Sequence, residues 1–327
     1  MNESVNFDRR AALGLLGAVP LLAAASPERV APEFRADREL RVPARGGKLY
    51  VRTNGLVHRS RAPLLFIHGG PGSSHWYFLP ALALADERPV ILYDQLDSGR
   101  SQIRNDPANW TVERFVSEID SIRGELGLDR LHIVGKSWGG AIAIEYAARR
   151  PAGLLSLTLA GPLVSTRSWE ASTRKRLTEL PRPVAEAIRR HERDGSTASP
   201  EYRAAIQLFY AAFDRRRPVP PGIAAYRDAL PMAFNPRLYT TMWGPGETAA
   251  SGSLRFYNAE PLLPRLAVPV MFLTGEYDEM MPSEIALLAR LVPDAVTRIV
   301  PGAGHSGCLD NPEDWVGEVR RFTNRYG

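Results

Sequence analysis

A serine, an aspartate and a histidine occur in this chain at positions where together they could cleave an acyl bond. Ser137 lies within Gly135-Lys136-Ser137-Trp138-Gly139, where the flanking glycines leave room for a serine held in a strained turn. A serine hydroxyl needs a base beside it and a carboxylate that orients the base. His305 and Asp278 follow later in the chain. We therefore predict acyl transfer with Ser137 as nucleophile, His305 as base and Asp278 as acid.

Each of these residues also has a structural interpretation. A Gly-x-Ser-x-Gly frame occurs by chance, and Asp278 could simply form a turn. Glu276 and Glu279 compete with Asp278 for the role of the acid. His305 is the only histidine that follows the acid at the end of a predicted strand, which favours it as the base over a structural histidine.

The oxyanion that forms during acyl transfer needs backbone N–H donors. We predict that Trp138, next to the nucleophile, supplies one of them. The other should come from the glycine-rich loop 68–72, with Gly70 preferred and Gly69 as the alternative. A phosphate-binding loop is disfavoured because this loop contains no Gly-Lys-Ser/Thr sequence. His68 and His75 have no further ligand cluster nearby, so we predict no metal and no cofactor.

The segments that carry these residues alternate between strand and helix patterns. Strands are predicted at 39–42 and 48–51, which form a hairpin, and at 64–67, 90–93, 131–134, 155–159, 270–273 and 296–300; helices are predicted at 112–126, 141–147 and 311–326. This alternation predicts an α/β fold with a mostly parallel sheet covered on both faces. Groups at the carboxyl ends of such strands converge on one crevice, and the order serine, aspartate, histidine is that of the α/β-hydrolase fold. The polar turn 94–101 is predicted to be structural, holding a loop near the site.

Between residues 163 and 246 the sequence suggests helices, including one over 201–213, and no strand. We predict an all-helical cap here, between a first core part at 26–162 and a second at 247–327. The formal net charge is +5, and the excess of positive residues lies in this insertion. Because basic and acidic residues alternate there, as in 174–179, we expect a solvated surface and no nucleic-acid site. The single cysteine, Cys308, excludes an internal disulfide.

Residues 1–25 resemble a twin-arginine export signal. Arg9 and Arg10 precede an apolar run, and small residues before Ser26 would allow cleavage. The run is short and broken by Pro20, so no stable membrane span is expected after cleavage. We predict a periplasmic protein, or a cytoplasmic one if the signal is not functional; the alternative is an uncleaved N-terminal helix or anchor.

Several motifs together resemble the proline iminopeptidase (prolyl aminopeptidase) family of serine peptidases, closest to its tricorn-interacting aminopeptidase and L-amino-acid amidase branch. The motifs are His68-Gly-Gly-Pro-Gly-Ser-Ser-His75, Tyr93-Asp-Gln-Leu-Asp-Ser-Gly-Arg-Ser101, Gly135-Lys-Ser-Trp-Gly-Gly140, Met242-Trp-Gly-Pro-Gly-Glu247, Gly275-Glu-Tyr-Asp-Glu279 and Gly304-His305. The resemblance spans roughly Glu39 to the C-terminus.

The resemblance implies the same triad and oxyanion donors. It further implies that Glu247 and Glu279 bind the free α-amino or imino group of the substrate, and that Tyr239 lines the pocket. Two carboxylates would hold a cationic amine by charge-assisted hydrogen bonds. The implied activity releases N-terminal proline or small apolar residues from small peptides or amino-acid amides through an acyl-enzyme.

The chain departs from the family pattern at three places. Lys136 stands where smaller residues are common, Trp138 stands where tyrosine is frequent, and the aromatic stretch 209–213 lacks a histidine. An esterase or lactonase of the same fold is therefore the alternative function, and a non-catalytic binding protein is a third. The sequence does not predict the oligomeric state.

Overall fold

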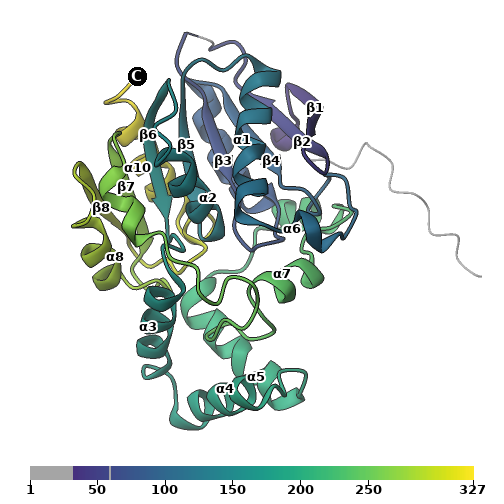
Figure 1. Ribbon diagram of the computed structural model, residues 1–327, viewed down its shortest axis with the longest axis vertical. Helices are drawn as coiled ribbons and strands as arrows, with labels where there is room; N and C mark the ends of the chain where they lie inside the picture. The colour runs from purple at the N-terminus through teal and green to yellow at the C-terminus, as the bar shows by residue number, and fades with distance from the viewer. Residues whose placement is uncertain (1–31, 59) are drawn as a thin grey trace, which may run out of the picture. The chain divides into compact units, whose positions relative to one another are not determined.

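Residues 32–58 and 60–327, which this computed structural model describes, form one eight-stranded β-sheet (Figure 1). The predicted export signal, residues 1–25, lies outside the described residues. The strands are β1 (Arg38–Ala44), β2 (Gly47–Asn54), β3 (Leu64–Ile67), β4 (Val90–Asp94), β5 (Leu131–Lys136), β6 (Leu154–Ala160), β7 (Val270–Gly275) and β8 (Ala295–Val300). Their order in the sheet is β1-β2-β4-β3-β5-β6-β7-β8. The pairs β1–β2 and β2–β4 are antiparallel and all others are parallel, which confirms the predicted mostly parallel sheet.

Helices cover both faces of the sheet. The α-helices are α1 (Val112–Leu126), α2 (Trp138–Ala147), α3 (Thr166–Leu177), α4 (Arg182–Asp194), α5 (Pro200–Phe209), α6 (Pro221–Asp228), α7 (Pro236–Met242), α8 (Pro282–Ala289), α9 (Gly307–Asp310) and α10 (Pro312–Thr323). Short 3₁₀ segments are η2 (Pro32–Phe34), η3 (His75–Asp86), η4 (Pro107–Asn109) and η6 (Glu260–Arg265), and η5 (Tyr210–Asp214) is a π-helix.

The alternation of side chains along β3 shows how the core is divided between the two faces. Leu65 and Ile67 belong to the large apolar cluster that includes α1 and α2. Phe66 points the other way and contacts Phe78 of η3 and Trp315 of α10, with ring centroids 5.1 and 6.4 Å apart. Every residue of β3 is buried, as expected for a central strand with helices on both faces.

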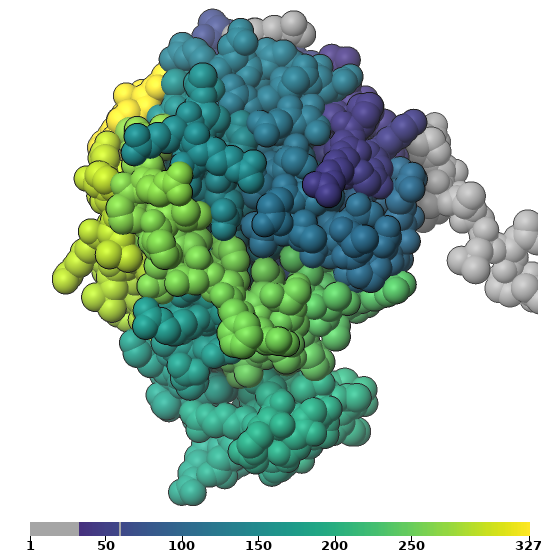
Figure 2. Space-filling model, in the orientation of Figure 1, coloured from purple at the N-terminus to yellow at the C-terminus, as the bar shows by residue number. Residues whose placement is uncertain are grey.

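Between β6 and β7 the chain forms helices α3 to α7, in the stretch where the sequence predicts an insertion. In Figure 2 the blue-green surface of α4 and α5 stands out at one end of the described unit. These helices have a small apolar core of their own, which includes Leu177, Ile188 and Phe209. No helix among residues 32–58 and 60–327 is long and apolar enough to cross a membrane.

The structure confirms the predicted elements that carry the candidate site, but it divides one predicted helix and shortens another. The helix predicted over 201–213 ends as an α-helix at Phe209 and continues as the π-helix η5. The C-terminal helix begins at Pro312, where Asn311 caps it by accepting a hydrogen bond from the N–H of Asp314. Pro312 has no N–H to donate, so it fits the first turn of a helix.

Candidate active site

Ser137 lies in the sharp turn between β5 and α2. Its backbone has φ 55° and ψ −121°, a left-handed conformation that costs energy in any residue with a side chain. Gly139 allows the turn, because a Cβ atom there would lie 2.1 Å from the carbonyl oxygen of Ile67. The serine side chain is thereby raised above the sheet at the wall of a pocket.

His305 and Asp278 follow the adjacent strands β8 and β7 and form a hydrogen-bonded pair. Nδ1 of His305 lies 2.8 Å from Oδ1 of Asp278, while His305 itself lines the same pocket as Ser137. Burial alone would raise the pKa of Asp278, but the charge and hydrogen bond of His305 outweigh it and hold that pKa below its usual range. Asp278 can therefore stay ionised behind the imidazole and orient it.

In the glycine-rich loop after β3, the two candidate oxyanion donors, Gly69 and Gly70, differ. The N–H of Gly69 donates to the hydroxyl of Tyr77, so that donor is already used. Gly70 lines the pocket with φ 115°, and a Cβ atom there would lie 2.6 Å from the nitrogen of Gly72. Trp138 is the first residue of α2, where a backbone N–H has no acceptor within the helix. The geometry favours Gly70 over the alternative Gly69.

Glu247 is held deep in the pocket by two tyrosines. Its Oε2 accepts hydrogen bonds from the hydroxyls of Tyr239, at 2.7 Å, and Tyr210, at 2.9 Å. Burial raises the pKa of Glu247 to about 7, although the two hydroxyls act in the opposite direction.

Glu279 is the second buried carboxylate of the pocket. Its Oε1 lies 3.7 Å from Nε2 of His305. Its Oε2 has no hydrogen-bond partner in the described part of the chain. Burial, and then the nearby charges of Glu247 and Asp214, raise the pKa of Glu279 well above its usual range. A cationic ligand would satisfy this pair, because it supplies both charge and donors.

Helices between β6 and β7 bind the backbone of the two segments that carry these carboxylates. Arg176 of α3 donates from Nε to the carbonyl oxygen of Asp278, at 2.8 Å, and from Nη2 to that of Glu276, at 3.0 Å. Glu192 of α4 accepts from the backbone N–H of Glu247 at 2.8 Å. The insertion is therefore part of the site and does not only cover it.

The turn that follows β4 supports the oxyanion loop, as predicted for 94–101. Asp94 accepts hydrogen bonds from the backbone N–H groups of His75, at 2.9 Å, and Arg100, at 2.8 Å. Gln95 donates to the carbonyl oxygen of His68 at 2.7 Å and accepts from the indole N–H of Trp138 at 3.0 Å. Trp138 thus fixes this turn against α2.

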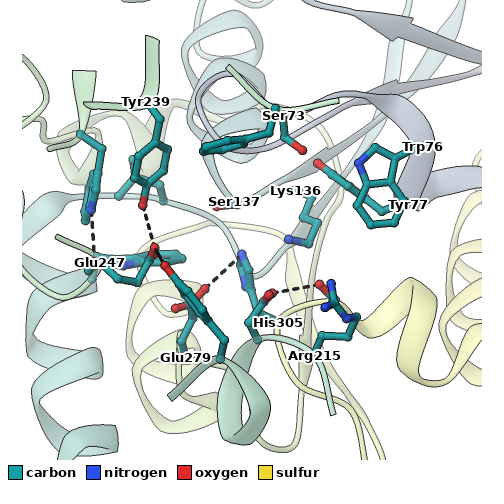
Figure 3. A pocket seen from close by; sticks show the side chains of 18 residues that line it. Ser73, Trp76, Tyr77, Lys136, Ser137, Arg215, Tyr239, Glu247, Glu279 and His305 are labelled. Carbon is teal, nitrogen blue, oxygen red and sulfur yellow. Dashed lines mark hydrogen bonds and ion pairs between the residues drawn. The ribbon is translucent and has the colours of Figure 1, made fainter. Parts of the chain in front are cut away.

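Most of the predicted site residues meet at one cavity of about 320 Å³, but Asp278 and Trp138 are not on its wall (Figure 3). The predicted residues on its wall are Gly70, Ser137, Tyr239, Glu247, Glu279 and His305. The sequence did not indicate Tyr210, Trp169 or Arg215, which also line it. Tyr210 lies in the aromatic stretch 209–213, whose lack of a histidine was the one feature of the sequence that could have pointed to this residue. Among the described residues, no cluster of three or more His, Cys, Asp or Glu side chains is arranged to hold a metal ion.

Comparison with known proteins extends the similarity over most of the chain. A family model described as the alpha/beta hydrolase fold matches residues 62–312. The proline iminopeptidase of Heyndrickxia coagulans is 35% identical over 263 residues, which is 80% of this chain and 90% of that protein. The crystal structure of VinJ has a TM-score of 0.82 at 32% identity, covering 90% of this chain and 100% of the other. The crystal structure of the Mycobacterium smegmatis proline iminopeptidase has a TM-score of 0.79 at 33% identity, covering 88% and 98%.

Proposed function

The chain belongs to the proline iminopeptidase family of α/β-hydrolases, and we propose that it is a serine hydrolase that releases N-terminal proline, or a small apolar residue, from short peptides or amides. The observation that carries this proposal is the pair of buried carboxylates, Glu247 and Glu279, in the same cavity as Ser137 and His305. An esterase without amine recognition has no use for two buried carboxylates whose burial costs stability.

The reaction follows from the roles proposed for these groups. Nε2 of His305 takes the proton of Ser137 as its oxygen attacks the scissile carbonyl, and Asp278 stabilises the imidazolium. The N–H groups of Gly70 and Trp138 stabilise the oxyanion; losing one such donor typically costs about 3–4 kcal/mol of transition-state stabilisation. His305 then protonates the leaving amine. Water hydrolyses the ester on Ser137 by the same steps in the second half of the reaction.

The carboxylate pair explains why the enzyme would act at an N-terminus. In the free protein the raised pKa values favour protonated Glu247 and Glu279, and the substrate's ammonium would take the place of these protons. The N–H donors of the ammonium would also satisfy Oε2 of Glu279, which has no hydrogen-bond partner among the described residues. Because both carboxylates line the cavity of Ser137, the bound amine would lie in the same cavity as the scissile bond. The rings of Trp169, Tyr239 and Trp243 line the same cavity and suit a small apolar side chain or a proline ring.

A panel of prolyl substrates tests this function. Purified protein should release p-nitroaniline from proline p-nitroanilide and lose that activity in Ser137→Ala. N-acetylation of the substrate should abolish turnover, because it removes the ammonium group. If simple esters are hydrolysed briskly while no free-amino substrate is turned over, the chain is instead an esterase or lactonase of this family.

We also propose that the protein is exported to the periplasm. The support is the arginine pair, Arg9 and Arg10, before the apolar run that ends near Ala25. Cell fractionation of the full-length protein, with N-terminal sequencing of the product, tests this. Replacing both arginines by lysine should retain the protein in the cytoplasm; an unprocessed cytoplasmic wild-type protein would refute export.

A further inference from the structure

The cavity has a basic side as well as an acidic one. Figure 3 shows Glu247, Glu279 and Tyr239 on one side of Ser137, and Lys136, Arg215 and Trp76 on the other. All of these side chains line the same cavity. The acidic side would hold the substrate's amine, so the chain that leaves after bond cleavage points toward the basic side.

Lys136 is a buried cation that forms no ion pair at contact distance with a described residue, although its charge acts on the nearby carboxylates of Asp278 and Glu279. Its residue is 9% exposed, and in the described part of the chain its ammonium makes no ion pair or hydrogen bond with a protein group. The ring of Tyr77 lies 5.1 Å from Nζ and offers a cation–π contact, but this leaves the three N–H donors without an acceptor. A buried ammonium in this state favours an anionic ligand.

Arg215 lies on the same side because the end of η5 is bound to the loop of His305. The N–H of His305 donates to the carbonyl oxygen of Phe213 at 2.8 Å, and the N–H of Ser306 donates to that of Asp214 at 2.6 Å. The half-buried guanidinium of Arg215 makes no ion pair with a described residue. Two cations without an ion pair at contact distance therefore line the cavity of His305. The carboxylate of Asp214 also lines this side, where it accepts a hydrogen bond from the hydroxyl of Ser306 at 2.9 Å.

From this arrangement we propose that Lys136, assisted by Arg215, binds the free α-carboxylate of the leaving amino acid, which makes dipeptides the preferred substrates. The inference rests on the proposed function and deepens it. In a dipeptide the carboxylate lies one residue, about 3.5 Å of chain, beyond the amine of the scissile bond. A third residue would carry that charge past the cavity, and an amide would remove it. The zwitterion of a dipeptide thus matches an acidic and a basic end with the serine between them.

Three substrates that share one scissile bond test the proposal: prolylglycine, prolylglycinamide and prolylglycylglycine. The measurement is kcat/KM for proline release. Charge-assisted hydrogen bonds of ordinary strength predict a preference of roughly 10- to 100-fold for prolylglycine over prolylglycinamide in the wild-type protein. The tripeptide should be disfavoured in the same direction.

Variants separate a role in binding from a role in folding. Lys136→Met should bring the ratio between prolylglycine and its amide close to one, and Lys136→Arg should restore part of it. Arg215→Gln should reduce the ratio less, since that side chain is only half-buried. Lys175→Met is the matched control, because Lys175 is exposed on α3 and pairs with Glu284; it should keep the wild-type ratio.

The wild-type comparison decides the matter even if a variant does not fold. A wild-type ratio near one would overturn the proposal while leaving the aminopeptidase function intact. So would a Lys136→Met protein that slows both substrates equally, because that result indicates a structural lysine. Absence of turnover on all three prolyl substrates would instead refute the proposed function, and the inference with it.

Discussion

Nε2 of His305 lies 3.7 Å from Oε1 of Glu279. The other ring nitrogen, Nδ1, is bonded to Asp278, so the proposed base stands between two carboxylates. Asp278 has a lowered pKa and Glu279 a raised one, although they are neighbours in sequence. The difference follows from their partners: His305 compensates the charge of Asp278, whereas Glu279 faces Glu247. Amine binding and proton transfer are thus adjacent events in this pocket.

Glu279→Gln should reduce activity, and at alkaline pH it should make the protein more stable relative to the wild type. The neutral amide cannot pair with an ammonium, so kcat/KM for prolyl substrates should fall roughly 10- to 100-fold. A carboxyl whose folded pKa is raised contributes stability that is complete below its unfolded pKa and is lost as pH rises through the folded value. The variant lacks that loss, so its thermal midpoint relative to wild type should be higher at pH 9 than at pH 5.

Thermal unfolding of both proteins at the two pH values measures this difference. Glu186→Gln is the control, because Glu186 is exposed on the cap. If the two thermal midpoints shift in parallel with pH, Glu279 does not carry the raised pKa.

Affinity for the substrate should depend on pH through Glu247. Below pH 7 this carboxyl holds a proton, since burial raises its pKa to about 7, and the ammonium must displace it. KM should therefore fall as pH rises toward 7, about tenfold for each pH unit from the proton of Glu247 alone, and the proton of Glu279, whose pKa is also raised, should add to this fall. Initial rates across pH give this profile. A KM that is flat from pH 5 to 8 would contradict it.

The strand ends carrying Ser137, Asp278 and His305 were predictable because apolar runs and glycine turns are local signals. The partners of Glu247 were not. Tyr210 is the first residue of the π-helix into which α5 continues, and its hydroxyl donates to that carboxylate. A helical pattern in the sequence does not indicate a π-helical turn.

The contacts between the cap and the sheet could not be predicted from the sequence either. The sequence predicts Arg176 to be one residue of a solvated basic surface. In the structure it is 5% exposed and donates to the backbone carbonyl oxygen of the proposed acid, Asp278. Sequence charge patterns predict the character of a helix face, but not which single arginine of that helix faces inward. Which arginine faces inward depends on how the helix packs against the rest of the protein.

Arg176→Met should destabilise the protein and impair catalysis together. The change removes the donor to the buried carbonyl group of Asp278 and the donor to the part-buried one of Glu276, which should cost ~2–3 kcal/mol of unfolding free energy. Arg174→Met, two residues earlier on α3, removes only an exposed pair with Glu170 and should change stability by less than about 1 kcal/mol. Urea denaturation with kcat/KM on proline p-nitroanilide measures both effects; equal losses in the two variants would refute the role of Arg176.

Tyr210→Phe should move the pH dependence of KM without removing activity. The hydroxyl of Tyr210 donates to Oε2 of Glu247 and lowers the pKa of that carboxyl, as does Tyr239. Without one donor the ionised form of Glu247 is less stable, so the fall in KM that its ionisation causes should shift to higher pH. Tyr239→Phe should act in the same direction, because its bond to the same oxygen is 2.7 Å long. Tyr257→Phe, whose hydroxyl contacts Glu145 away from the cavity, is the control and should keep the wild-type profile. An unchanged or lower midpoint in Tyr210→Phe would show that the π-helix tyrosine does not tune the amine site.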